Sequence, residues 1–353
     1  MAYSTISKPS LHFNTKLYTG NGGTNAQTGV GFQPDWVWIK SRSDTSNHRI
    51  YDAVRGGTKT LYSNLNNAQG TNSDAITSFD SDGFTLGGNA QSNGNGLSLA
   101  SWCWRAGTGQ GSSNTDGSIN TTYTSVNTTA GFSISQYTGT GSNATVGHGL
   151  GAVPQVVLIK ELNGTNNWIM SHQPLSASLG DYTRFMTLNS GSAVSGAGNV
   201  VFQSSAFTSS VFNVGTSAGS NGSGQNYIAY CFAEKTGYSK FGYYTGNGNA
   251  DGTFVYTGFK PAWILLKRSN SSGTSWLLYD NKREGYNVDN DHLQANGNNA
   301  EGTSDDLDIL SNGFKMRTSG SGENGSGNTY IYMAFAEEPL VANVGASIPA
   351  TAR

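Results

Sequence analysis

The chain has 353 residues, a formal net charge of −2 and charged side chains at only 12% of its positions. Without a run of like charge or a long apolar run, we expect no nucleic-acid partner, no membrane insertion and no secretory signal. Glycine contributes 48 residues, yet 17 Tyr, 15 Phe and 7 Trp are spread along the chain, which excludes a disordered polymer and favours short strands joined by polar loops.

Similar landmarks recur in the same order three times along the chain. A Tyr-Thr-Gly tripeptide begins at Tyr18, Tyr137 and Tyr244. Each tripeptide is followed by a turn ending in proline and by an apolar strand that ends in lysine. A second strand and an aromatic closing strand come next. The predicted strands are 36–40, 49–52 and 99–104, then 156–160, 168–172 and 227–232, then 263–267, 276–280 and 330–335.

These repeats predict an all-β chain of three tandem β-sandwich modules of the jelly-roll kind, with an immunoglobulin-like sandwich as the nearest alternative. Module 1 spans residues 1–107, module 2 spans 131–238 and module 3 spans 239–338. Residues 108–130 form a Gly/Ser/Thr/Asn-rich linker with one edge strand within 119–126. Residues 339–353 form a C-terminal tail.

The strand after each proline is apolar on both faces. In module 1, Trp36 and Trp38 point to one side of the sheet, and Val37 and Ile39 point to the other. One face belongs to the core of the module, so a neighbouring module or another subunit must cover the second face. We expect subunit contacts to provide this cover, which predicts a homo-oligomer, with a trimer favoured.

Five residues are candidates for a ligand or subunit contact: Lys40, Lys160, Lys267, Trp36 and Trp38. The three lysines occupy equivalent strand ends, where an ammonium group ordinarily extends to water and where a shared ligand is the alternative. The tryptophans could stack on sugar rings, although aromatic residues at strand positions more often build a core.

No other residues form a recognisable catalytic, cofactor-binding or metal site, so we predict a protein that is not an enzyme and needs no cofactor. The histidines are dispersed, and His172 stands where the other modules have Asp52 and Asp280. Asp80 and Asp82, like the acidic stretch 305–308, lack the ligand spacing of a calcium loop. Cys103 and Cys231 occupy equivalent positions, which predicts two buried, unpaired thiols.

Several stretches resemble a family of virion structural proteins that is common in marine tailed phages and whose members are often described as tail-fibre proteins. The stretches are residues 31–40, 115–119, 127–133, 137–151, 230–234, 310–315 and 330–337. The resemblance implies concanavalin-like or laminin-G-like jelly rolls and brings no catalytic motif.

We therefore expect a virion surface protein, a tail fibre, spike or capsid appendage, made in the host cytoplasm. It would act in host attachment or particle decoration, with other virion proteins and a host surface glycan as partners. The alternative is a carbohydrate-binding, lectin-like protein, which requires an exposed aromatic side chain beside polar loop residues in a groove. A glycan-cleaving enzyme would instead require a carboxylate pair about 5–9 Å apart in a cleft.

Overall fold

The structure, a computed structural model, describes residues 4, 6–196 and 198–339 and confirms the all-β fold. Module 1 contains η1 (Pro9–Leu11), β1 (Phe13–Thr19), β2 (Asn25–Gln27), β3 (Trp36–Ser41), β4 (Arg49–Asp52), β5 (Lys59–Thr60), β6 (Gly70–Thr71), β7 (Ile76–Asp80), β8 (Gly83–Leu86), α1 (Ala90–Asn93) and β9 (Ser98–Trp104). The next segment contains β10 (Tyr123–Asn127), β11 (Phe132–Thr138), β12 (Ala144–Gly147), β13 (Val156–Glu161), β14 (Ile169–His172), α2 (Gln173–Ser178), β15 (Arg184–Thr187), β16 (Ser195–Gly196), β17 (Val211–Val214), α3 (Ala218–Asn221) and β18 (Asn226–Phe232). Module 3 contains β19 (Ser239–Thr245), β20 (Phe254–Tyr256), β21 (Phe259–Arg268), β22 (Leu277–Asp280), β23 (Asp289–Gln294), β24 (Gly302–Leu310), β25 (Gly313–Met316) and β26 (Thr329–Pro339).

The main sheet of each module has the same antiparallel strand order. The order is β1-β9-β3-β4 in module 1, β11-β18-β13-β14 in module 2 and β19-β26-β21-β22 in module 3. The closing strand thus lies between the first strand and the strand that follows the proline. The register is also shared, because Trp36 pairs with Trp104, Val156 with Phe232 and Trp263 with Phe335.

A smaller set of strands packs over the outer face of each main sheet. These strands are β2-β8-β7 in module 1, β12-β17 in module 2 and β24-β25-β20 in module 3. Between the two layers lies a separate apolar core, formed by Val37 and Ile39 with Phe84 and Leu86 in module 1. Modules 2 and 3 have corresponding cores. This two-layer packing is the β-sandwich expected from the repeats.

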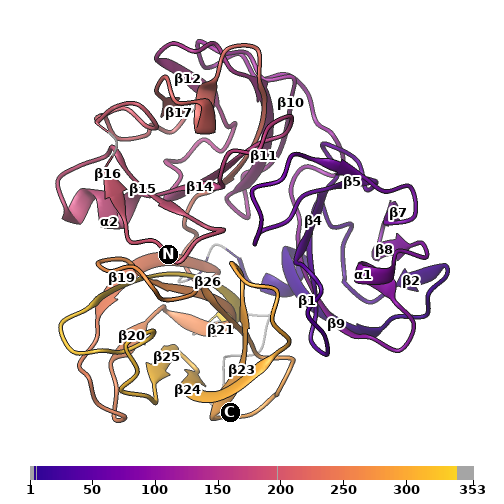
Figure 1. The fold of residues 1–353 in the computed structure, drawn as a ribbon, viewed down its shortest axis with the longest axis vertical. Helices are drawn as coiled ribbons and strands as arrows, with labels where there is room; N and C mark the ends of the chain where they lie inside the picture. The colour runs from indigo at the N-terminus through magenta and orange to yellow at the C-terminus, as the bar shows by residue number, and fades with distance from the viewer. Residues whose placement is uncertain (1–3, 5, 197, 340–353) are drawn as a thin grey trace.

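Figure 1 shows the modules as lobes arranged around a common centre. The inner faces of the main sheets meet there in one aromatic core. Trp36 is 4.8 Å from Tyr230 between ring centroids, Trp104 is 5.3 Å from Trp263, and Phe232 is 5.9 Å from Phe335. Each of these ring pairs joins two different modules. The cavity among them has a volume of about 10 Å³, which leaves essentially no room for water.

This core covers the second apolar face of the post-proline strands within a single chain. Trp36 is 2% exposed and Trp38 is 1% exposed. Two ways to cover this face were expected, a neighbouring module or another subunit. The neighbouring modules cover it. The expectation that subunit contacts must cover it is wrong, because three sheets packed around one axis bury one another's inner faces.

Two local features refine the predicted boundaries. The edge strand in segment 108–130 is β10, which pairs with β11 and so extends the main sheet of module 2. Pro261 lies inside β21, where the pairing with β26 shifts register on either side of it. A proline lacks the N–H group of a regular ladder, so its position at an irregularity is expected.

Candidate functional site

Lys40, Lys160 and Lys267 are fully buried. The expectation that their ammonium groups extend to water is therefore wrong. Each ammonium group turns back onto the loop that follows its strand. Lys40 Nζ donates to the carbonyl oxygens of Ser41 and Asp44 at 2.5 and 3.0 Å. Lys160 Nζ donates to those of Glu161 and Gly164 at 2.7 and 3.3 Å.

Lys267 repeats this arrangement and adds contacts outside its own loop. Its Nζ donates to the Arg268 carbonyl at 2.8 Å, to Thr274 Oγ1 at 3.0 Å and to the Gly191 carbonyl of module 2 at 3.4 Å. Burial lowers the pKa of all three lysines to about 8, since the charged form loses its hydration. The lysines thus hold loops in place, and the structure does not present them to a ligand.

Trp36 and Trp38 are likewise enclosed by the central core. The Trp38 indole Nε1 donates to His48 Nδ1 at 2.8 Å, and His48 Nε2 lies 3.0 Å from the Gln294 carbonyl of module 3. The carbonyl oxygen can only accept, so Nε2 carries the proton in this contact. Neither tryptophan has a face open to a sugar or to another subunit.

His48 belongs to the first of two rings of contacts that join the modules. The equivalent residues Trp168 and Trp276 also donate ring N–H groups across a module boundary. Trp168 Nε1 donates to the Tyr62 carbonyl of module 1 at 2.7 Å, and Trp276 Nε1 donates to the Thr187 carbonyl of module 2 at 3.0 Å. Each module therefore donates to one neighbour and accepts from the other.

The second ring of contacts starts from the last residue of the second strand in each module. Asp52 Oδ2 accepts from the Tyr230 hydroxyl of module 2 at 2.7 Å and forms an ion pair with Arg55 at 2.5 Å. Asp280 Oδ2 accepts from Trp102 Nε1 of module 1 at 2.9 Å and forms an ion pair with Arg283 at 2.7 Å. All of these side chains are buried, so their charges are balanced inside the protein.

His172 completes this second ring with a neutral side chain. Its Nε2 lies 3.4 Å from the Tyr332 carbonyl of module 3, and its Nδ1 accepts from the Leu175 amide at 3.3 Å. Leu175 stands where the other modules have arginine, and Met333 stands where they have the Tyr230 hydroxyl or the Trp102 indole. A buried aspartate would have no cationic partner here. Burial lowers the pKa of His172 to about 4, which keeps its ring neutral.

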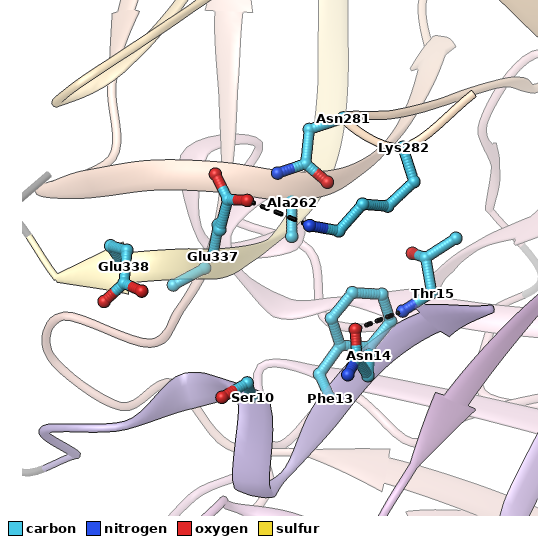
Figure 2. Close-up of a pocket in the computed structure, with 10 residues that line it drawn as sticks. Ser10, Phe13, Asn14, Thr15, Ala262, Asn281, Lys282, Glu337 and Glu338 are labelled. Carbon is cyan, nitrogen blue, oxygen red and sulfur yellow. Dashed lines mark hydrogen bonds and ion pairs between the residues drawn. The ribbon is translucent and has the colours of Figure 1, made fainter. Parts of the chain in front are cut away.

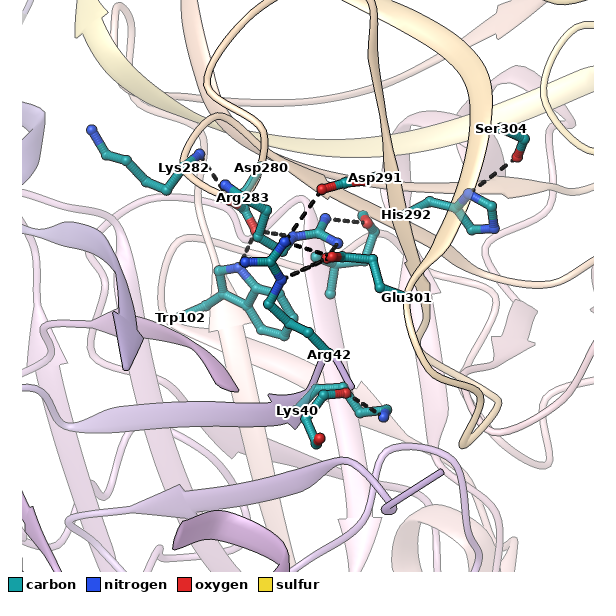
Figure 3. A network of polar contacts seen from close by, with 12 residues as sticks. Lys40, Arg42, Trp102, Asp280, Lys282, Arg283, Asp291, His292, Glu301 and Ser304 are labelled. Carbon is teal, nitrogen blue, oxygen red and sulfur yellow. Dashed lines mark hydrogen bonds and ion pairs between the residues drawn. The ribbon is translucent and has the colours of Figure 1, made fainter. Parts of the chain in front are cut away.

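Figure 3 shows how the boundary between modules 1 and 3 extends into an ion-pair network. The Arg42 guanidinium binds both carboxylate oxygens of Glu301, at 2.6 to 3.0 Å, and lies 3.3 Å from Asp291. Arg283 also binds Glu301, at 2.7 Å. Burial and the nearby Glu301 charge raise the pKa of Asp291. Arg42 thus bridges the carboxylates of Glu301 and Asp291. This arrangement suits a structural link between modules better than a pair of general acid and base groups.

A polar pocket of about 170 Å³ opens between modules 1 and 3 (Figure 2). Its wall includes Glu337, which forms ion pairs with Lys260 at 2.8 Å and with Lys282 at 3.1 Å. The side-chain oxygen of Asn281 and the hydroxyl of Thr15 are buried there with no partner in the described part of the chain. The volume and polarity suit a few water molecules.

Two grooves near the boundary between modules 2 and 3 carry exposed tyrosines. In the first, of about 300 Å³, Tyr256 lies beside the Glu234–Lys240 ion pair and is 51% exposed. In the second, of about 280 Å³, Tyr243 is 46% exposed and lines the groove together with Leu179, the C-cap of α2. The second groove is lined by Leu175, Ser178, Leu179, Val194, Tyr243, Ser269, Asn270 and Thr329.

The acidic stretches do not gather into a metal site among the described residues. Asp82 accepts the amide hydrogens of Gly29 and Gly31 at 2.9 and 2.7 Å, and Asp80 accepts from the Thr85 hydroxyl at 2.7 Å. These carboxylates therefore hold turns. The side chains of residues 305 and 306 lie outside the described part. Cys103 and Cys231 are buried and unpaired, as predicted.

A repeated buried asparagine is the structural feature that the sequence interpretation missed. Asn93, Asn221 and Asn324 are fully buried near the start of the loop before each closing strand. Asn221, for example, donates to the carbonyls of Ser142 and Gly215 and accepts from the Thr140 amide. The signal was present in the sequence, because each asparagine begins an Asn-Gly-x-Gly tetrapeptide.

The fold and contacts define an all-β protein of β-sandwiches joined through a shared core. A family model described as a domain of unknown function, DUF7483, matches residues 8–339, and the chain belongs to this family. No curated protein and no solved structure matches the chain. Within the described residues, no helix is long and apolar enough to span a membrane.

Proposed function

We propose that this chain is a structural protein on the surface of a tailed-phage particle, made in the host cytoplasm and acting in host attachment or in particle decoration. The sequence stretches that resemble virion structural proteins support this role. Several of them form the framework of the molecule, since β3, β11, β18 and β26 contain residues of those stretches.

The observation that carries the proposal is the use of buried polar groups as links between modules. The residues Asp52, His172 and Asp280 each contact a different neighbouring module. His48, Trp168 and Trp276 precede these residues in the same three modules. They contact the neighbouring modules in the opposite direction around the centre. Such a body keeps its outer loops at fixed relative positions, which suits a protein that presents contacts rather than one that closes over a substrate.

Mass spectrometry of purified particles and antibody labelling in electron cryomicroscopy test this proposal. We expect the chain in particles at a fixed copy number and the label on the tail or capsid surface. Absence of the chain from particles that are made in cells expressing it would contradict the proposal.

The partners that we propose are other virion proteins and a host surface glycan. The homo-oligomer stays a prediction, but the apolar face on which it was based is filled inside the chain. The chain itself already has a trimer-like arrangement around its centre. Sedimentation at micromolar concentration tests the point, and a single species of 37.1 kDa would contradict the oligomer.

The second candidate function is carbohydrate binding by a lectin-like protein. The exposed Tyr243 and Tyr256, each in a groove with hydroxyl-bearing neighbours, favour this alternative. Binding to a glycan array by protein that is absent from particles would favour the lectin over the virion component.

A further inference from the structure

We propose that the Tyr243 groove, between α2 of module 2 and β19 of module 3, binds a neutral oligosaccharide. This inference deepens the host-attachment role in the proposed function and names the ligand class and the site. It rests on the shape of the groove, on the chemistry of its lining and on the contacts that hold its walls.

The groove is built from elements that are fixed relative to one another. Tyr243 lies in β19, where it pairs with Ile331 of β26. On the other side, His172 is the N-cap of α2, and its ring accepts a hydrogen bond from the Leu175 amide. The Val194 amide donates to the Ser269 carbonyl at 2.8 Å across the module boundary. The walls are therefore positioned before any ligand arrives, which reduces the entropic cost of binding.

The lining has the chemistry that a sugar ring requires. Tyr243 offers a half-exposed aromatic ring, and an aromatic ring packs favourably against the C–H groups of a pyranose. Ser178 is exposed and already donates its hydroxyl hydrogen to the carbonyl of Leu175, so its oxygen retains lone pairs for a sugar hydroxyl. Ser269 is 1% exposed and donates to the carbonyl of Thr329, so it holds the floor of the groove. Asn270 adds an exposed amide at the rim.

The absence of charge among the lining residues selects between classes of glycan. None of the residues that line the groove is acidic or basic. The Tyr256 groove differs, because its wall contains the Glu234–Lys240 ion pair. Arg268 adjoins the rim, where its guanidinium already donates to Asn270 and Asn328 at 3.2 and 2.8 Å. The lining itself offers no cation to balance a sulfated or uronic-acid glycan, so a neutral glycan is the matching ligand.

Tyr243 is also specific to this module boundary. The equivalent positions on the first strands of modules 1 and 2 are Leu17 and Gln136, which share its register with the closing strands. A tyrosine with only a structural role in the repeat would be expected at all three positions. The aromatic ring occurs where α2 supplies the opposite wall.

Titration of the full-length protein with a panel of neutral oligosaccharides tests the proposal. The panel consists of hexamers of β-1,4-glucose, α-1,4-glucose, β-1,3-glucose, mannose and N-acetylglucosamine. Binding is measured by isothermal titration calorimetry and by saturation-transfer NMR. We expect at least one to bind, and we expect its affinity to be similar at about 50 mM and about 500 mM salt. Tyr243→Ala should weaken that binding at least about ten-fold, or about 1.4 kcal/mol.

Two further variants make the outcome decisive. Ser178→Trp, at an exposed position of α2, should block the groove and abolish binding without changing the thermal midpoint. Tyr286→Ala removes a tyrosine that is 63% exposed elsewhere in module 3 and should bind like the wild type. No binding by any member of the panel, or binding that Tyr243→Ala leaves unchanged, would overturn the proposal.

The test also separates this inference from the proposed function. A chain that is present in particles but binds no neutral oligosaccharide would refute the site and leave the virion role intact. A chain that binds through Tyr243 but is absent from particles would refute the virion role and leave the site.

Discussion

Asp280 of module 3 accepts a 2.9 Å hydrogen bond from the indole Nε1 of Trp102 in module 1, inside the protein. Asp280→Ala would leave the buried Arg283 guanidinium with Glu301 as its remaining carboxylate partner. We expect a loss of about 3–5 kcal/mol in the free energy of unfolding. Trp102→Phe keeps an aromatic ring but removes the donor, which should cost at least about 1–2 kcal/mol.

Urea unfolding of the single and double variants measures this link. Because the two residues are in contact, the effects of the two substitutions should not add. Asp74→Ala, at an exposed aspartate, serves as the control and should change the free energy of unfolding by less than about 0.5 kcal/mol. If Asp280→Ala behaves like this control, Asp280 does not link the modules.

The shared core predicts that the modules unfold together. Trp263 of module 3 lies 5.3 Å from Trp104 of module 1 between ring centroids and packs against Phe335 of its own module. Trp263→Ala should therefore destabilise the whole chain by about 3–5 kcal/mol and lower one common transition. Differential scanning calorimetry and tryptophan fluorescence should report the same midpoint. Separate transitions for the modules would show that the central core does not couple them.

Burial of the three strand-end lysines predicts their protection from amine reagents. At pH about 8 much of an exposed amine with a pKa of about 8 would be deprotonated and reactive. Lys40, Lys160 and Lys267 should nevertheless stay unlabelled by acetic anhydride in the native protein, whereas Lys282, which is partly exposed, should react. Mass spectrometry after labelling in denaturant provides the fully modified reference. Native labelling of the three lysines would place their ammonium groups in solvent.

His172 predicts a loss of stability in weak acid. Its folded pKa of about 4 lies below its ordinary value of 6.5, so the unfolded chain binds more protons between these values. The free energy of unfolding should therefore fall as the pH falls from about 6.5 to about 4. His172→Gln keeps polar atoms at this position but cannot titrate, so its stability should depend less on pH in that range.

The buried histidine His48 provides an internal comparison for this measurement, because burial lowers its pKa as well. Some pH dependence should thus remain in His172→Gln.

The Asp280 carboxyl affects the free energy of unfolding in a lower pH range than the two histidines. Burial alone would raise its pKa, but Arg283 and hydrogen bonds lower it overall, so its contribution is lost as the pH falls below about 4. Identical pH profiles for the wild type and His172→Gln would refute the assignment.

Much of the fold was predictable from local sequence. The recurring Tyr-Thr-Gly tripeptides, the prolines and the alternation in the post-proline strands identified the main strands, since side-chain direction alternates along a strand whatever its surroundings. The burial of Cys103 and Cys231 followed from their equivalent positions on the closing strands. The two apolar faces of the strand containing Trp36 also followed from this alternation.

What covers the second face depended on tertiary structure, because alternation reports that a face is buried but not against what. The lysines show the same limit: their strand position was correct, but the direction of the ammonium group depends on carbonyl oxygens in a later loop. The change from Asp52 and Asp280 to His172 becomes intelligible only when Met333 and Leu175 are seen around it. Sequence spacing determined which residues repeat, and the packing of three sheets around one centre decided which of them meet.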